Sequence, residues 1–176
     1  MVLNVKENML SFGANVQIIT NSGNRITKER FIDEASGQQL LRLDTGENEL
    51  LEPLNIKNVN IHGYDCVAIS DYDKGFLTTQ KIFDLVDWFD GPVFIDSKKT
   101  TLPVHKDNVF IKINEDEYKK LTHQESKNLI VTKGANGADY QGTNYPAIGC
   151  GVFDVCGAGD TFLASLVYFF SFTSSS

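Results

Sequence analysis

Residues 66–97 read CVAISDYDKGFLTTQKIFDLVDWFDGPVFIDS, and this stretch decides the fold. Its apolar runs at 66–69 and 93–95 are short and rich in β-formers, which is typical of buried strands. Between them, residues 79–89 carry apolar side chains at helical spacing, and Gly91-Pro92 ends that helix. The order strand, helix, strand predicts a βαβ unit of a parallel sheet.

The same alternation continues toward the C-terminus. Further strands are predicted at 109–111 and 129–132, a short helix at 115–121, and a last helix at 160–170 that is apolar nearly all round and therefore expected to be buried. The fold class is α/β, a Rossmann-like three-layer α/β/α arrangement with a mostly parallel sheet. Polar residues follow the strands, at the edge where such sheets bind ligands: Asp71, Asp96, Asn114 and Thr132.

One segment breaks the alternation. Residues 26–33 and 38–44 are both strand-like and are joined by a short polar loop, which predicts an antiparallel hairpin. We expect a small β flap, within about residues 25–60, lying over the site.

The composition of the chain limits the classes of function that it can have. At 176 residues we expect one domain, 1–176, and a net charge of -7 argues against a nucleic-acid partner. Three cysteines without paired spacing indicate reduced thiols and a cytoplasmic protein. The N-terminus does not read as a signal peptide, and the most apolar run, 162–172, is too short to span a membrane.

The strongest motif is Asp154-Val-Cys-Gly157-Ala-Gly159-Asp160-Thr-Phe162. Two glycines lead into an apolar helix, so the amides of residues 157–159 can converge on an anion at the helix N-terminus. A carboxylate at Asp160 is then placed to accept a hydroxyl proton beside that anion. The alternative is an ordinary Asp N-cap after a glycine-rich turn.

Two further patterns carry alternatives of the same kind. Asn114 and Glu117 have the spacing of a capping box, with Asn at the cap and Glu three residues on. Thr132, Gly134 and Gly137 surround an Asn-Gly pair that is typical of a tight turn.

Taken together, these motifs resemble the ribokinase-like (PfkB) carbohydrate kinases, whose signature D-x-x-G-A-G-D-x-F is matched at every specified position. The resemblance implies a kinase that uses ATP and Mg²⁺. It implies that Asp160 is the base and that the amides of Gly157, Ala158 and Gly159 form the anion hole. Asn114 and Glu117 would organise Mg²⁺ through water, and Thr132, Gly134 and Gly137 would line the nucleotide.

Other stretches resemble the heptose 7-phosphate kinase domains of bifunctional heptose kinase/ADP-heptose synthases, which serve lipopolysaccharide synthesis. These are Ser70-Asp-Tyr-Asp-Lys-Gly75, the hairpin pattern K-x-R … Q-Q-x-x-R-x-D, and Asp96-Ser-Lys98, where the family has D-P-K. The resemblance implies that the substrate side includes Lys28, Arg30, Gln39, Arg42, Asp71, Lys74 and Lys98. Taken singly, each charged residue is also consistent with a solvated surface side chain, and for Lys28 or Lys98 alone that interpretation is favoured.

The resemblance leaves three hypotheses. The chain phosphorylates heptose 7-phosphate at the anomeric position, or another sugar or nucleoside such as ribose or fructose, or it is an inactive binding or structural module. The family's first strand and C-terminal helices have no counterpart here, and Met1-Val2-Leu3 stands where two glycines are expected, so we expect a truncated domain. A homodimer through the flap is also expected.

Overall fold

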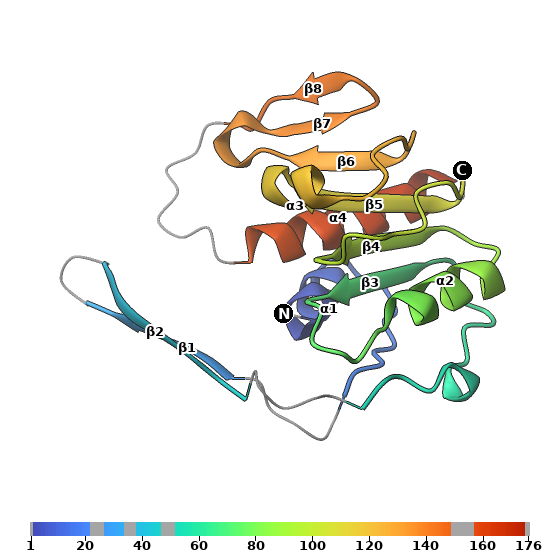
Figure 1. Cartoon of the computed structure of the whole chain (residues 1–176), viewed down its shortest axis with the longest axis horizontal. Helices are drawn as coiled ribbons and strands as arrows, with labels where there is room; N and C mark the ends of the chain where they lie inside the picture. The colour runs from blue at the N-terminus through green and yellow to red at the C-terminus, as the bar shows by residue number, and fades with distance from the viewer. Residues whose placement is uncertain (1, 22–26, 34–37, 47–51, 149–156, 175–176) are drawn as a thin grey trace.

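The computed structural model describes residues 2–21, 27–33, 38–46, 52–148 and 157–174. Its centre is a six-stranded sheet in the order β3-β4-β5-β6-β7-β8 (Figure 1). The first four strands are parallel, and the last two add antiparallel at one edge. The strands are β3 (Val67–Asp71), β4 (Val93–Ser97), β5 (Val109–Asn114), β6 (Leu129–Thr132), β7 (Ala138–Tyr140) and β8 (Thr143–Tyr145). The predicted mostly parallel α/β fold is confirmed.

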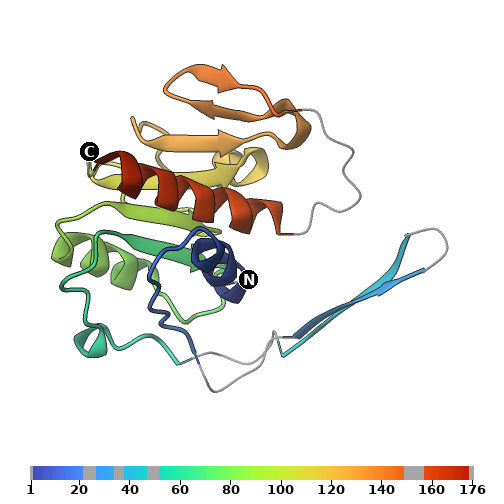
Figure 2. The same ribbon diagram turned by 180° about the vertical axis from the view of Figure 1, so that it is seen from behind.

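Helices cover both faces of this sheet. α2 (Thr79–Trp88) and α3 (Glu115–Lys120) lie on one face, and α1 (Val2–Ser11) and α4 (Ala158–Ser174) lie on the other (Figures 1 and 2). Strand β4 shows why, because its apolar side chains alternate between the two faces. Val93 and Ile95 pack in the core under α2, whereas Phe94 packs with α1 and α4.

The helices on the second face differ from the prediction. α4 is only half buried, since Leu163 and Ala164 face the sheet but Phe169 is 59% exposed. The even distribution of apolar residues around this helix hid which side faces the sheet. α1 was not predicted at all, although Val5 and Met9, four residues apart, form its buried face against α4. No helix within the described ranges has both the length and the apolar character needed to cross a bilayer.

The predicted hairpin forms, but its predicted position is wrong. β1 (Thr27–Ile32) pairs antiparallel with β2 (Gln39–Thr45). Figures 1 and 2 show the pair extending away from the sheet rather than over it. The apolar side chains of Phe31 and Leu41 are at least half exposed, so they do not anchor the hairpin to the body. Alternation in the sequence determines strand pairing but not where the pair docks. The predicted flap range, about residues 25–60, also includes η1 (Ile56–Asn58), which is a single 3₁₀ turn and not a strand.

Candidate active site

Asp160 lies in the first turn of α4 and is 5% exposed. Both of its carboxylate oxygens accept hydrogen bonds. Asn4 Nδ2 on α1 donates to Oδ2 at 3.1 Å, and the Tyr72 hydroxyl, which follows β3, donates to Oδ1 at 3.2 Å. Three segments far apart in the sequence thus converge on one carboxylate. Residues 154–156 of the motif lie outside the described residues.

The two glycines of the motif lie close to the ends of flexible side chains, and Gly157 is also favoured by its positive φ. Gly157 has φ of 83°, and a Cβ there would lie 2.7 Å from Asn4 Nδ2. A Cβ on Gly159 would lie 2.9 Å from Lys112 Nζ. The N–H groups of the first helical turn have no partner within the helix. The start of α4 therefore offers donors beside Asp160, as the anion-hole prediction requires.

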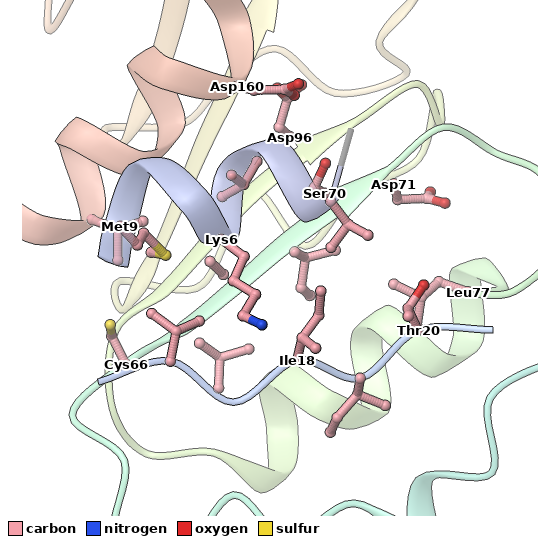
Figure 3. Close-up of a pocket in the computed structure, with 18 of the residues that line it drawn as sticks. Lys6, Met9, Ile18, Thr20, Cys66, Ser70, Asp71, Leu77, Asp96 and Asp160 are labelled. Carbon is pink, nitrogen blue, oxygen red and sulfur yellow. The ribbon is translucent and has the colours of Figure 1, made fainter. Parts of the chain in front are cut away.

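A cleft of about 1600 Å³ opens in front of Asp160. Pockets that bind one small ligand usually measure ~300–1,000 Å³, so this cleft is larger than a typical pocket for a single ligand. Figure 3 shows Asp160 and Asp96 close together on one side of the cleft, with Met9 and Cys66 on another. The residues of the polar end are Tyr72, Lys74, Asp96, Lys98, Lys112, Asn114, Glu117, Gly157, Gly159 and Asp160.

Tyr72 remains a proton donor at any ordinary pH. Burial, and then the negative charges of Asp160 and Asp96, hold the pKa of its phenol well above the usual range. Lys98 lies over its ring, with Nζ 5.0 Å from the ring centroid, which is cation–π geometry. Tyr72 was quoted in the sequence only as part of a motif, and its contact with Asp160 was missed.

Lys112 was also missed. It is 6% exposed, and its Nζ lies 2.7 Å from Oδ2 of Asp96 on the neighbouring strand. Burial raises the pKa of Asp96, Lys112 opposes that rise, and the charges of Glu117 and Asp160 add to it. A single lysine inside the apolar strand Val109–Asn114 was the signal that could have found this pair.

Asp71 lines the cleft, and its role on the substrate side stays a prediction. It is 6% exposed and is engaged by protein groups: Ser97 Oγ donates to Oδ2 at 2.8 Å, and Lys99 Nζ lies 3.4 Å away. The backbone N–H of Asp73 donates to its other oxygen. Ser97 stands where the family motif has proline, which has no hydroxyl to donate. Asp71 therefore fixes the loop that carries Tyr72.

Asn114 and Glu117 form the capping box. The Asn114 side chain accepts from the backbone N–H of Glu117, and the Glu117 side chain accepts from that of Asn114, both at 2.9 Å. Glu117 also faces the cleft, where its charge acts on Asp96. Among the described residues no group of three His, Cys, Asp or Glu side chains is arranged as a metal site. Carboxylate oxygens beside a phosphate are nevertheless the donor set that suits Mg²⁺, which keeps several waters and needs few protein ligands.

The residues predicted to line the nucleotide lie at the next strand end. Thr132 pairs with Asn114 across β5 and β6, and its hydroxyl donates to the backbone of Ile113. Gly134 begins the 3₁₀ turn η2 (Gly134–Asn136). Gly137 has φ of 88°, and a Cβ there would lie 1.9 Å from the carbonyl oxygen of Tyr145. The predicted tight turn is confirmed, and these three residues do not line the cleft in front of Asp160.

The predicted substrate-side cations separate into two groups. Lys74 and Lys98 line the cleft. Lys28, Arg30, Gln39 and Arg42 belong to the hairpin, whose backbone projects away from the sheet, and their side chains lie outside the described part of the chain. The backbone of the hairpin does not approach the strand ends that carry Lys74 and Lys98 (Figure 1).

Comparison with known proteins tests the resemblance to the carbohydrate kinases. The sequence model described as pfkB family carbohydrate kinase matches residues 107–173. The resemblance to this family is confirmed. The matched segment includes β5, α3, β6 and the Gly157–Asp160 start of α4. It contributes these residues to the polar end of the cleft: Lys112, Asn114, Glu117, Gly157, Gly159 and Asp160.

Individual relatives agree with the family match. The chain is 31% identical to a protein named Bifunctional protein HldE from a Nitratiruptor species, over 94% of this chain and 47% of the relative. It is 29% identical to one of the same name from Campylobacter curvus, over 93% and 41%. The chain thus spans about half the length of the curated relatives it matches.

A solved structure supports the fold. Ribokinase from Thermotoga maritima matches with a TM-score of 0.53 and 14% identity, over 82% of this chain and 55% of that one. At that identity the likeness concerns the fold alone, which is ribokinase-like.

Proposed function

We propose that this chain transfers the γ-phosphoryl group of ATP to a sugar hydroxyl, with Asp160 as the catalytic base. The observation that carries the proposal is the position of Asp160, buried in the first turn of α4 beside the amides of residues 157–159 and facing a cleft of about 1600 Å³. The match to carbohydrate kinases over the same residues supports it.

The geometry supports each part of the transfer. A carboxylate has about four acceptor sites, so the donors Asn4 and Tyr72 leave room on Asp160 for a sugar hydroxyl. Asp160 accepts that proton as the sugar oxygen attacks phosphorus, and the bond to the nucleotide's β–γ bridging oxygen breaks. The amides at the start of α4 bind the charge on the transferring group. Mg²⁺, when bound near Glu117, would neutralise charge on the phosphates.

The cleft also contains a polar group that lacks a partner. Ser70 Oγ is buried without a hydrogen-bond partner among the described residues, and Figure 3 shows it in the cleft between Asp160 and Asp71. Buried hydroxyls are nearly always paired in folded proteins. Because this oxygen is buried, a sugar hydroxyl bound beside Asp160 would reach it only after the surrounding side chains move.

Heptose 7-phosphate is the sugar we propose, with phosphorylation at the anomeric position. Support comes from the motifs around Ser70 and the hairpin, and from relatives named HldE. A different sugar or nucleoside is the second candidate, favoured by the ribokinase fold. The two differ in whether the acceptor already carries a phosphate.

A phosphorylated acceptor should be preferred. One phosphate bound by a lysine or arginine gains ~1.5–3 kcal/mol per charged hydrogen bond, or at least about tenfold in kcat/KM. We expect heptose 7-phosphate to exceed free heptose by that factor in an ATP-dependent assay with a sugar panel. If residues at the strand ends bind the phosphate of the sugar, Lys98→Ala should reduce the preference for heptose 7-phosphate. If the hairpin binds it, Arg30→Ala should reduce that preference. Equal use of both sugars would transfer support to the second candidate.

We also propose that the protein forms a homodimer through the hairpin. We place it in the cytoplasm, because its proposed substrate ATP is available there. Phe31, Leu41 and Leu43 share one face in the β1–β2 register and are 44–56% exposed. Sedimentation should show a dimer that Leu41→Lys weakens, because a charge on this face opposes burial. A monomer at all concentrations would contradict the proposal.

A further inference from the structure

Lys112 is a buried cation next to the start of α4. Its Cα is the direct partner of Asp96 across β4 and β5, and the two side chains form an ion pair of 2.7 Å at the carboxyl ends of these strands. Only 8% and 14% of the two side chains are exposed. A buried ion pair usually gains less from its attraction than it loses by leaving water, so fold stability alone does not explain this one.

The position of the ammonium group relates it to the anion hole. A Cβ atom added to Gly159 would lie 2.9 Å from Lys112 Nζ. The ammonium group is therefore beside the first-turn amides of α4 and one residue from Asp160. Both Lys112 and Gly159 line the cleft. Any phosphate that reaches those amides comes close to the ammonium.

The polar end of the cleft contains several negative charges near Lys112. Glu117 and Asp160 are close enough to Asp96 for the charge of each to raise its pKa. A nucleotide brings several more negative charges to the same place. Amides alone carry only partial charges, so a phosphate entering among three carboxylates requires a full positive charge nearby.

We propose that Lys112 binds the transferring phosphate of the nucleotide directly, and that Asp96 holds its ammonium group in place before the nucleotide arrives. This inference rests on the proposed phosphotransfer function and adds a residue to it. Lys112 contributes charge and hydrogen bonds only, and the proton of the acceptor still passes to Asp160.

Binding of ATP without sugar, measured by calorimetry in Mg²⁺, tests the proposal on four proteins: the unchanged chain, Lys112→Met, Asp96→Asn, and the double variant. We expect Lys112→Met to weaken ATP binding at least about tenfold, the effect of a lost charged hydrogen bond. Asp96→Asn should bind ATP as tightly as the unchanged chain or more tightly, because it frees the ammonium. The double variant should be as weak as Lys112→Met.

The double variant separates phosphate binding from a structural role. If Lys112 serves only to neutralise Asp96, removing both charges restores ATP binding, and that result would overturn the proposal. So would a folded Lys112→Met that binds ATP within about twofold of the unchanged chain. If Lys112→Met does not fold, the double variant decides, since it leaves no buried charge unpaired.

The matched control is Lys106→Met, which breaks the exposed ion pair with Asp87 and should leave ATP binding unchanged. The readout is independent of turnover. A chain that binds ATP through Lys112 but phosphorylates no sugar would refute the proposed function and leave this inference standing.

Discussion

Asp160→Asn should lower kcat by ~10²–10⁴-fold while ATP binding persists, because general bases contribute that much. The amide has nearly the shape of the carboxylate but cannot accept the acceptor's proton. The amides at the start of α4 and the Lys112 ammonium are unchanged, so the nucleotide keeps its contacts. Steady-state kinetics with a sugar accepted by the unchanged chain, together with ATP calorimetry, measures both effects.

The control for this substitution is Asp116→Asn. Asp116 makes an exposed ion pair with Lys119 on α3, and its replacement should change neither kcat nor ATP binding. Asp160→Asn should also lose one hydrogen bond. The new side chain has an NH₂ group in place of one oxygen, so either Asn4 or Tyr72 will lose its acceptor. A melting curve shows whether the fold tolerates this. A folded Asp160→Asn protein that retains more than about a tenth of the original kcat would remove Asp160 from the role of base.

The sheet was predictable from sequence because its pattern is local. A strand buried on both faces must be continuously apolar, as 93–95 and 109–111 are, and helical spacing at 79–89 is equally direct. The position of the hairpin was not predictable, since the alternation that predicts its pairing carries no information on where the pair lies relative to the sheet. The same limit applies to α4, where an apolar sequence on all sides does not say which side faces the sheet.

Within the candidate site, sequence reasoning found the residues at helix and strand ends but not their partners. Asp160 and the glycines share one short motif, whereas Asn4 and Tyr72 reach Asp160 from 156 and 88 residues away. The expectation that Asp71 binds sugar did not include the protein groups that bind the same carboxylate. Its partners Ser97 and Lys99 follow a different strand, and only the β3–β4 register brings them together.

Lys99→Met should destabilise the chain by about 3 kcal/mol, near the lower end of the range for breaking a buried ion pair. The side chains of Lys99 and Asp71 are 7% and 5% exposed. Without the ammonium, Asp71 keeps a negative charge away from water. The remaining donors, Ser97 Oγ and the N–H of Asp73, compensate in part, which is why we expect the lower end. Denaturant unfolding followed by fluorescence measures the change.

Two further variants make this result specific. Lys106→Met breaks the exposed pair with Asp87, whose side chains are 51% and 59% exposed, and should change the unfolding free energy by less than about 1 kcal/mol. Lys99→Met combined with Asp71→Asn removes both buried charges and should recover most of the stability. Because Asp71 and Lys99 fix the loop that carries Tyr72, Lys99→Met should also lower kcat. If its unfolding free energy matches that of Lys106→Met, the buried pair does not hold this loop.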